Sequence, residues 1–237
     1  VEHLNVPGVV KDVSFTVRRG EILGFCGLVG AGRTETMEAL FGYRRKQSGT
    51  VRIGGRTVEI RKPADAIRSG MAFVTEDRKQ TGLFLPLDAA DNILMPSLQQ
   101  YSAGGLIRNA AFAADSDELI SRLNVKTPSR RQIVDYLSGG NQQKLLLARW
   151  MHRQPEVIIL DEPTRGIDVG AKAEIYEMIG RMAQEGRCII VISSELPEVM
   201  GISDTIAVMH DGRLVKTVAR ADFDSNVLMQ YATGLNS

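Results

Sequence analysis

The sequence is short of several features that would assign a protein to a class at once. It has only two cysteines, Cys26 and Cys188, which lie far apart in apolar segments predicted to be strands. Two such residues favour reduced core side chains over a disulfide framework, which indicates a cytosolic compartment. No apolar run approaches the roughly 18 to 20 residues that a membrane-spanning helix needs. No signal-peptide pattern is present, so we expect another chain to hold this one if it acts at a membrane.

A strong charge of either sign is also missing. The chain has 29 lysines and arginines against 28 aspartates and glutamates, a formal net charge of +1 over 237 residues. This balance does not favour nucleic acid or an anionic membrane surface as the main partner. There is no internal repeat and no low-complexity linker. With 43% hydrophobic residues, the chain can bury the core of one domain.

Short apolar runs alternate with helical patterns along much of the chain. Continuous apolar runs predict strands that are covered on both faces, and their alternation with helices predicts an α/β fold with a mostly parallel sheet. These buried strands are predicted at residues 21–26, 71–74, 157–160 and 188–192, and the intervening helices at 33–41 and 171–184.

Other segments predict antiparallel strands and a helical part. Residues 12–17 alternate polar and apolar side chains. The pairs Gly54-Gly55 and Asp211-Gly212 predict hairpin turns, because such residues accept the positive φ angles that tight hairpins need. The strands that they join are predicted at 50–53 with 56–60 and at 205–209 with 213–218. Residues 85–135 lack strand-like runs and predict a mostly helical insertion, after which Ser138 caps another helix.

A glycine-rich loop lies between the first buried strand and the first helix. Residues 27–34, Gly-Leu-Val-Gly-Ala-Gly-Arg-Thr, have the spacing of a P-loop, with Arg33 in place of the usual lysine. Glycines let successive backbone N–H groups point at phosphate oxygens, and the helix start adds its positive dipole. Arg33 supplies a cation for the phosphates and Thr34 a hydroxyl for Mg²⁺. Taken alone, the loop is also compatible with a strand–helix turn that binds nothing.

An acidic pair follows another buried strand. Asp161 ends the apolar run 157–160, where the carboxyl ends of strands in α/β sheets meet ligands. Its carboxylate is suited to Mg²⁺, and Glu162 is suited to polarise an attacking water. The alternative is a pair of surface acids that simply closes a strand, which the upstream loop makes the weaker interpretation.

The run Leu-Ser-Gly-Gly-Asn-Gln-Gln-Lys at 137–144 resembles the signature motif of ATP-binding-cassette (ABC) proteins. The resemblance covers essentially the whole chain. It implies the ABC ATPase fold, a P-loop NTPase with a mostly parallel sheet, an antiparallel β subdomain and a helical subdomain. The expected division is a core of residues 1–84 and 149–237 with a helical signature subdomain at 85–148. In this family the P-loop of one cassette and the signature of another enclose each ATP.

The resemblance also implies roles for individual residues. The nucleotide and its Mg²⁺ would be held by Gly27, Leu28, Val29, Gly30, Ala31, Gly32, Arg33, Thr34 and Glu35, with Thr34, Glu76 and Asp161 on the metal. Catalytic roles would fall to Glu162, Ser194 and Asp168, the acid of the D-loop. Ser138, Gly139, Gly140 and Gln142 would contact ATP bound by the partner cassette.

Several positions depart from the common family pattern. Glu76 stands where the Q-loop usually has glutamine, and Ser194 where the switch usually has histidine. No aromatic residue upstream of the loop is suited to stack on adenine. Arg33, the Glu-Asp-Arg-Lys run at 76–79 and the Ser-Ser-Glu run at 193–195 together resemble the carboxyl-terminal cassette of bacterial importers of the ribose, galactose and xylose type. In that family two cassettes share one polypeptide, so the Val1 start suggests a cut from a longer chain.

This resemblance implies a working hypothesis and leaves alternatives. The chain would be an ATPase half of a monosaccharide importer, peripheral on the cytoplasmic face of the bacterial inner membrane. Its partners would be the amino-terminal cassette, transmembrane permease subunits and, indirectly, an extracytoplasmic sugar-binding protein, with no nucleic acid. Arg33 and Ser194 suggest a slow site, so a regulatory half with little turnover is the second hypothesis. A soluble ABC protein of DNA repair or translation is the third, against which the near-neutral charge and the lack of a coiled-coil insertion weigh.

Overall fold

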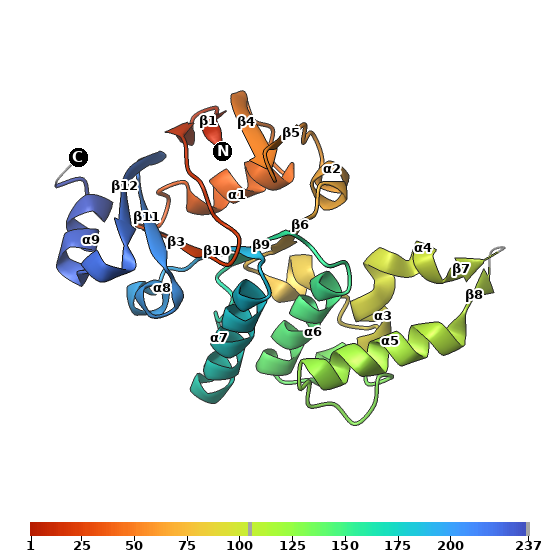
Figure 1. The fold of residues 1–237 in the computed structure, drawn as a ribbon. Helices are drawn as coiled ribbons and strands as arrows, with labels where there is room; N and C mark the ends of the chain where they lie inside the picture. The colour runs from red at the N-terminus through yellow and green to blue at the C-terminus, as the bar shows by residue number, and fades with distance from the viewer. Residues whose placement is uncertain (104–105, 236–237) are drawn as a thin grey trace. The chain divides into compact units, whose positions relative to one another are not determined.

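The computed structural model describes residues 1–103 and 106–235, and its contacts divide the chain into two compact units (Figure 1). The first unit comprises Val1–Phe73, Glu156–Glu162 and Ile179–Ser237, and the second comprises Val74–Pro155 and Pro163–Met178. The expected division at residues 85 and 148 stays a prediction. Within the described ranges, no helix combines the length and the apolar character that crossing a membrane requires.

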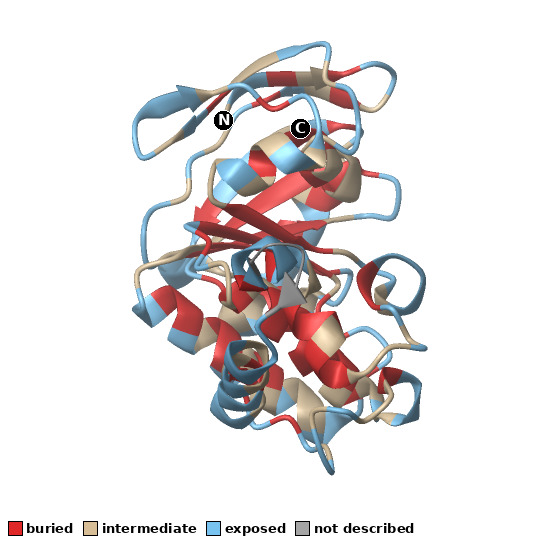
Figure 2. Ribbon diagram, turned by 90° about the vertical axis from the view of Figure 1, so that its right-hand side faces the viewer, coloured by how far each residue is buried: buried red, intermediate tan, exposed pale blue. Residues whose placement is uncertain are grey.

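A six-stranded sheet forms the centre of the first unit. Its order is β12-β11-β3-β10-β9-β6, in which β9, β10, β3 and β11 run parallel and β12 is antiparallel to β11. The central strands are buried along nearly their whole length, which explains their continuous apolar sequences (Figure 2). The predicted mostly parallel sheet is therefore confirmed. The strands are β3 (Ile22–Gly27), β6 (Met71–Val74), β9 (Val157–Asp161), β10 (Cys188–Ile192), β11 (Thr205–His210) and β12 (Arg213–Ala219).

A four-stranded sheet of order β2-β1-β4-β5 belongs to the same unit. Its strands are β1 (Glu2–Val6), β2 (Val10–Val13), β4 (Ser48–Ile53) and β5 (Arg56–Val58). The β4–β5 turn has φ angles of 56° at Gly54 and 78° at Gly55, as the predicted hairpin requires. The predicted strand at 12–17 is wrong beyond Val13. Asp12 has a φ of 58°, which breaks the extended backbone, and the paired register of β1 and β2 is irregular.

Three helices pack against the larger sheet within the first unit, α1 (Arg33–Phe41), α8 (Leu196–Ile202) and α9 (Ser225–Ala232). The same unit contains α2 (Pro63–Arg68), which contacts α1, and the short 3-10 turn η4 (Arg220–Asp222). Val199 of α8 and Leu228 of α9 are fully buried in one apolar cluster with Cys26, Ile206 and Val208 of the sheet. Cys26 is free and buried there, and Cys188 is also free, as the sequence predicted.

The second unit is mostly helical, as predicted for residues 85–135. Its elements are η1 (Arg78–Gly82), α3 (Ala89–Leu94), η2 (Met95–Ser97), α4 (Leu98–Tyr101), α5 (Asn109–Arg122), η3 (Val134–Tyr136), α6 (Gly139–Met151) and the start of α7 (Val169–Gln184). It also contains a two-stranded antiparallel sheet of β7 (Ser102–Ala103) and β8 (Leu106–Ile107), which the sequence analysis did not predict. Ser138 caps α6 as expected, since its hydroxyl accepts two hydrogen bonds from Asn141, one from the backbone N–H at 3.5 Å and one from the side-chain amide at 2.9 Å.

Candidate functional site

The predicted phosphate loop joins the carboxyl end of β3 to the start of α1. Gly27 begins it with a φ of 152°, and a Cβ there would lie only 2.4 Å from the Met209 carbonyl oxygen of β11. Gly30 and Gly32 also have positive φ, so the chain curls before the helix starts. Val29 at the tip is 92% exposed. The loop therefore turns its backbone outward at the end of the sheet where α/β proteins bind ligands.

Neighbouring segments brace the loop from behind. The Ala31 carbonyl accepts a hydrogen bond from the Gly212 N–H at 3.1 Å, and the Gly212 carbonyl accepts from the Lys11 N–H at 2.7 Å. A Cβ at Gly32 would lie 3.2 Å from both the Gly212 Cα and the Val9 carbonyl oxygen. The β11–β12 turn thus packs directly against the loop. Such support keeps the loop in shape before any ligand arrives.

Arg33 does not simply project toward solvent. Its side chain is 9% exposed, and its Nη1 donates to the Ser193 carbonyl oxygen at 2.6 Å. Ser193 follows the carboxyl end of β10, so the guanidinium ties the first turn of α1 to the predicted switch segment. A guanidinium has further N–H groups, so this bond leaves donors for a phosphate.

Asp161 is a buried carboxyl group at the end of β9. It is 1% exposed, and neither carboxylate oxygen has a hydrogen-bond partner of regular geometry among the described residues. Burial raises the pKa of Asp161 to about 7, the Glu162 charge adds to this, and the Thr34 hydroxyl and Arg33 guanidinium offset part of it. A buried carboxylate without partners beside a threonine hydroxyl is a donor set that fits Mg²⁺.

Glu162 lies next to this group in a strained backbone conformation. Its φ is 48°, rare for a residue with a side chain, and its N–H donates to the Ile192 carbonyl at 2.9 Å. The Glu162 Oε2 accepts a hydrogen bond from the Ser194 hydroxyl at 3.2 Å. Burial raises the pKa of Glu162, while the Ser194 hydroxyl and the Arg33 guanidinium partly oppose that rise. The backbone turn aims this carboxylate toward the switch segment.

Part of this set lines one cavity in the first unit. The cavity, of about 160 Å³, is lined by loop residues, by Arg33, by Ser193 and Ser194, and by Leu228 and Met229 of α9, whereas Asp161 and Glu162 do not line it. The sequence analysis assigned no role to Ser193, which is 1% exposed and whose hydroxyl bonds the buried Glu198 carboxylate. Ser193 therefore fixes the segment that carries Ser194. The sequence feature that could have indicated this role is the position of Ser193 after an apolar strand and next to the predicted switch residue.

The predicted signature residues lie in the second unit at the start of α6. Gly140 packs closely, since a Cβ there would lie 2.6 Å from the Ala171 Cβ. The first N–H groups of the helix have no intrahelical acceptor, as suits binding of an anion. Gln142 lies in the first turns of the same helix. It is 2% exposed and its amide donates to the Val134 carbonyl at 3.1 Å, so its side chain faces the interior here, and its predicted contact with a partner's nucleotide stays a prediction.

Glu76 and Asp168 also lie in the second unit. The Glu76 carboxylate forms an ion pair with Arg165, one of the residues before Asp168. Asp168 is exposed, and its Oδ1 accepts from the Ala171 N–H at 3.0 Å in the first turn of α7. In this structure both acids therefore have structural partners. Their predicted roles at metal and active site stay predictions.

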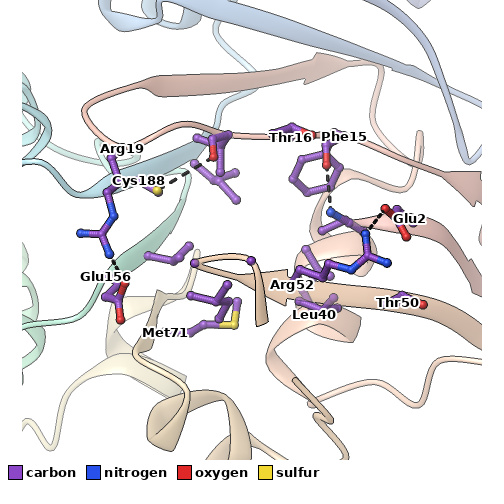
Figure 3. A pocket seen from close by; sticks show the side chains of 18 residues that line it. Glu2, Phe15, Thr16, Arg19, Leu40, Thr50, Arg52, Met71, Glu156 and Cys188 are labelled. Atoms are coloured by element: carbon purple, nitrogen blue, oxygen red, sulfur yellow. Dashed lines mark hydrogen bonds and ion pairs between the residues drawn. The ribbon is translucent and has the colours of Figure 1, made fainter. Parts of the chain in front are cut away.

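A larger cavity of about 400 Å³ lies in the first unit, at the amino ends of β9 and β10 (Figure 3). Ion pairs of Arg19 with Glu156 and of Arg52 with Glu2 line it, above an apolar floor that includes Met71. None of the predicted site residues contributes to its lining. The phosphate loop and the two acids lie at the other, carboxyl, ends of the strands.

Comparison with known proteins gives concordant results. The family model described as ABC transporter matches residues 10–165. A Geobacillus kaustophilus (strain HTA426) protein assigned as a ribose/galactose/methyl galactoside import ATP-binding protein is 49% identical over 99% of this chain, which covers 46% of that protein. The ribose import ATP-binding protein RbsA of Lactococcus lactis subsp. lactis (strain IL1403) is 50% identical over 94% of this chain and 46% of its own length. The chain thus spans about half the length of these relatives.

Solved structures show similarity of fold. A crystal structure of an ATP-binding cassette of an ABC transporter in its ADP conformation has a TM-score of 0.79 at 17% identity, covering 97% of this chain and 96% of the other. A dimeric cassette in a post-hydrolysis state, bound to ADP and Pi, has a TM-score of 0.77 at 20% identity, covering 94% and 97%.

Proposed function

The chain belongs to the ABC transporter family, and on that basis we propose that it is an ATP-binding and ATP-hydrolysing cassette of a monosaccharide importer. The observation that carries the proposal is the arrangement in the first unit. The phosphate loop, the unpartnered Asp161 carboxylate and the Ser194–Glu162 hydrogen bond all lie at the carboxyl ends of neighbouring strands.

The loop binds the nucleotide phosphates in this proposal. Backbone N–H groups of residues 27–35 face the phosphate oxygens, and the start of α1 contributes its dipole. Arg33 adds positive charge while it stays bonded to the Ser193 carbonyl. Thr34 and Asp161 would hold Mg²⁺, which supplies charge neutralisation for the phosphates when bound. The buried, unpartnered oxygens of Asp161 support this assignment.

Glu162 is the group that polarises the attacking water. Burial raises its pKa, which makes its carboxylate a stronger base. Ser194 orients that carboxylate through the hydrogen bond at 3.2 Å. It does so from the switch position at which the family commonly has histidine. Because Ser193 is anchored by Arg33 and by Glu198, the hydroxyl of Ser194 comes from a fixed segment.

The partners of the cassette follow from the same proposal. Ser138, Gly139 and Gly140 would complete the nucleotide site of an amino-terminal cassette in the same polypeptide, as the relatives' greater length suggests. Permease subunits would hold the pair, peripherally, at the cytoplasmic face of the membrane, and an extracytoplasmic binding protein would deliver the sugar. The names of the relatives support ribose or galactose type sugars as cargo.

A Glu162→Gln variant of the full-length chain, assembled with its permease, tests the proposal. We expect ATPase activity and uptake of labelled ribose or galactose to fall at least about tenfold. Glu59→Gln is a charge-matched control, because Glu59 is exposed and pairs only at the surface with Arg61. Unchanged activity in Glu162→Gln would instead mean that this cassette is a regulatory half of the importer with little turnover of its own. The comparisons give that alternative no support.

A further inference from the structure

The segment just after Glu76 contains a feature with no assigned role. Residues Arg78–Gly82 form η1, a single π-helical turn whose cap, Asp77, accepts from the N–H groups of Lys79 and Gln80, each at 3.0 Å. Such turns are rare and occur often at functional positions. The far end of η1 is held by α6, because Arg149 donates to the Gly82 carbonyl.

Arg78, the first residue of η1, forms hydrogen bonds with the loop that precedes α7. Its Nη1 donates to the Arg165 carbonyl at 2.8 Å and its Nη2 to the Gly166 carbonyl at 3.3 Å. Its Nε is buried without a hydrogen-bond partner among the described residues. The planar guanidinium therefore donates from two of its nitrogens to two consecutive carbonyl groups of the D-loop, a fixed fork geometry that the single ammonium nitrogen of a lysine does not reproduce.

The same guanidinium lies against the first residue of the signature helix. A Cβ at Gly139 would lie 2.8 Å from Arg78 Nη2 and 3.4 Å from the Gly166 carbonyl oxygen. The missing side chain at Gly139 thus makes room for Arg78 between α6 and the D-loop. The ion pair of Glu76 with Arg165 adds a further link between the segment that precedes η1 and the D-loop.

We propose that Arg78 is a positioning residue that locks the D-loop, residues 164–168, to the start of α6. Ser138, Gly139, Gly140 and Asp168 then form one preorganised surface for the partner cassette. This inference rests on the proposed function, because it assigns Arg78 to the surface that would complete the partner's ATP site. Loss of Arg78 frees the D-loop but leaves this chain's own phosphate loop in place.

The test compares Arg78→Ala, Arg78→Lys and Lys79→Ala in the full-length, assembled transporter. Lys79 is the next cation along the chain, is exposed, and makes none of these side-chain contacts. For Arg78→Ala we expect kcat to fall about tenfold, with KM for ATP changed less than about twofold. Arg78→Lys, with a single ammonium nitrogen in place of the planar fork, should be intermediate, and Lys79→Ala should match the wild type.

Two further readouts separate positioning from a general loss of structure. Hydrogen exchange of residues 164–168 should accelerate in Arg78→Ala, while the melting temperature stays within about 2 °C. A kcat within about twofold of the wild type would overturn the inference, and so would a fall in kcat matched by loss of ATP binding or melting temperature. If the wild-type transporter itself lacks ATPase activity, the proposed function fails instead.

Discussion

The Ser194 hydroxyl donates to the Glu162 carboxylate across 3.2 Å, so a serine makes the side-chain contact that orients the carboxylate predicted to polarise the attacking water. Both residues follow buried parallel strands, Glu162 after β9 and Ser194 after β10, and these strands are paired in register. The contact is therefore a direct result of the sheet. Ser194 provides one short hydrogen-bonding group that does not change its charge near neutral pH.

Replacing Ser194 tests this relationship. In Ser194→Ala the Glu162 carboxylate loses its only hydroxyl contact described here, and we expect kcat of the assembled transporter to fall about tenfold while ATP affinity changes little. Ser203→Ala is the matched control, since the Ser203 hydroxyl is buried in the same unit and has no hydrogen-bond partner among the described residues. Steady-state ATPase rates and equilibrium nucleotide binding give the two quantities. Equal kcat in Ser194→Ala and the control would contradict the role.

Asp161 should show opposite effects on stability and on binding. Its carboxylate is buried, and neither oxygen has a hydrogen-bond partner of regular geometry among the described residues, an arrangement that costs about 1–3 kcal/mol and more while the group is charged. In Asp161→Asn the neutral amide removes the part of that cost that comes from the charge, so we expect a higher melting temperature without nucleotide. The same change removes the proposed Mg²⁺ ligand, so Mg²⁺ should no longer strengthen ATP binding.

Thermal unfolding and titration of ATP with and without Mg²⁺ check both halves of this prediction. Asp211→Asn serves as the control, because the Asp211 carboxylate is exposed and pairs with Lys11 at the surface. A melting temperature of Asp161→Asn below that of the wild type would show that the buried charge does not destabilise the nucleotide-free fold.

Gly140 is expected to be intolerant of any side chain. A methyl group there meets the Ala171 Cβ at 2.6 Å, so Gly140→Ala should destabilise the second unit by about 1–3 kcal/mol and impair turnover. Gly180→Ala is the control, because a Cβ on that helical glycine meets nothing within 4 Å and should be neutral or stabilising. Denaturant unfolding measures the difference. The double variant Gly140→Ala with Ala171→Gly should recover most of the loss, and failure to do so would exclude this contact as the cause.

Much of the fold was predictable because local patterns and tertiary structure agree. The run 188–192 is apolar at every position and is β10 with the same bounds, and Gly54-Gly55 forms the predicted hairpin. The strand predicted at 12–17 fails beyond Val13. The side chains of Phe15 and Val17 alternate and are half-buried as the pattern predicts, but this segment pairs with no neighbouring strand among the described residues. Phe15 instead packs its ring against Phe25 with a centroid distance of 5.1 Å.

The site was less predictable, because contacts between distant segments decide it. Spacing alone located the loop and the acids, but it could not show that Arg33 bonds the Ser193 carbonyl or that Arg78 holds the D-loop. Gln142 shows what a motif leaves open. It belongs to a run that the resemblance assigns to ligand binding, and only the structure shows that the turn of α6 points its side chain into the interior.

His152 gives a prediction for the dependence of stability on pH. Its ring lies 3.0 Å from the Tyr101 hydroxyl, which donates to Asp115, and burial lowers the pKa of His152 although Asp115 partly opposes this. The folded protein then binds a proton here less readily than the unfolded chain, so its contribution to stability is lost as the pH falls through about 6.5. Asp161, with a pKa raised to about 7, titrates in the same pH range, and its effect on stability has the opposite sign.

The measurement is therefore the difference in unfolding free energy between the wild type and His152→Asn, taken from pH 8 to pH 5 in steps of about one pH unit. We expect the advantage of the wild type to shrink below about pH 6.5, whereas a constant difference would mean that His152 titrates alike in the folded and unfolded chains.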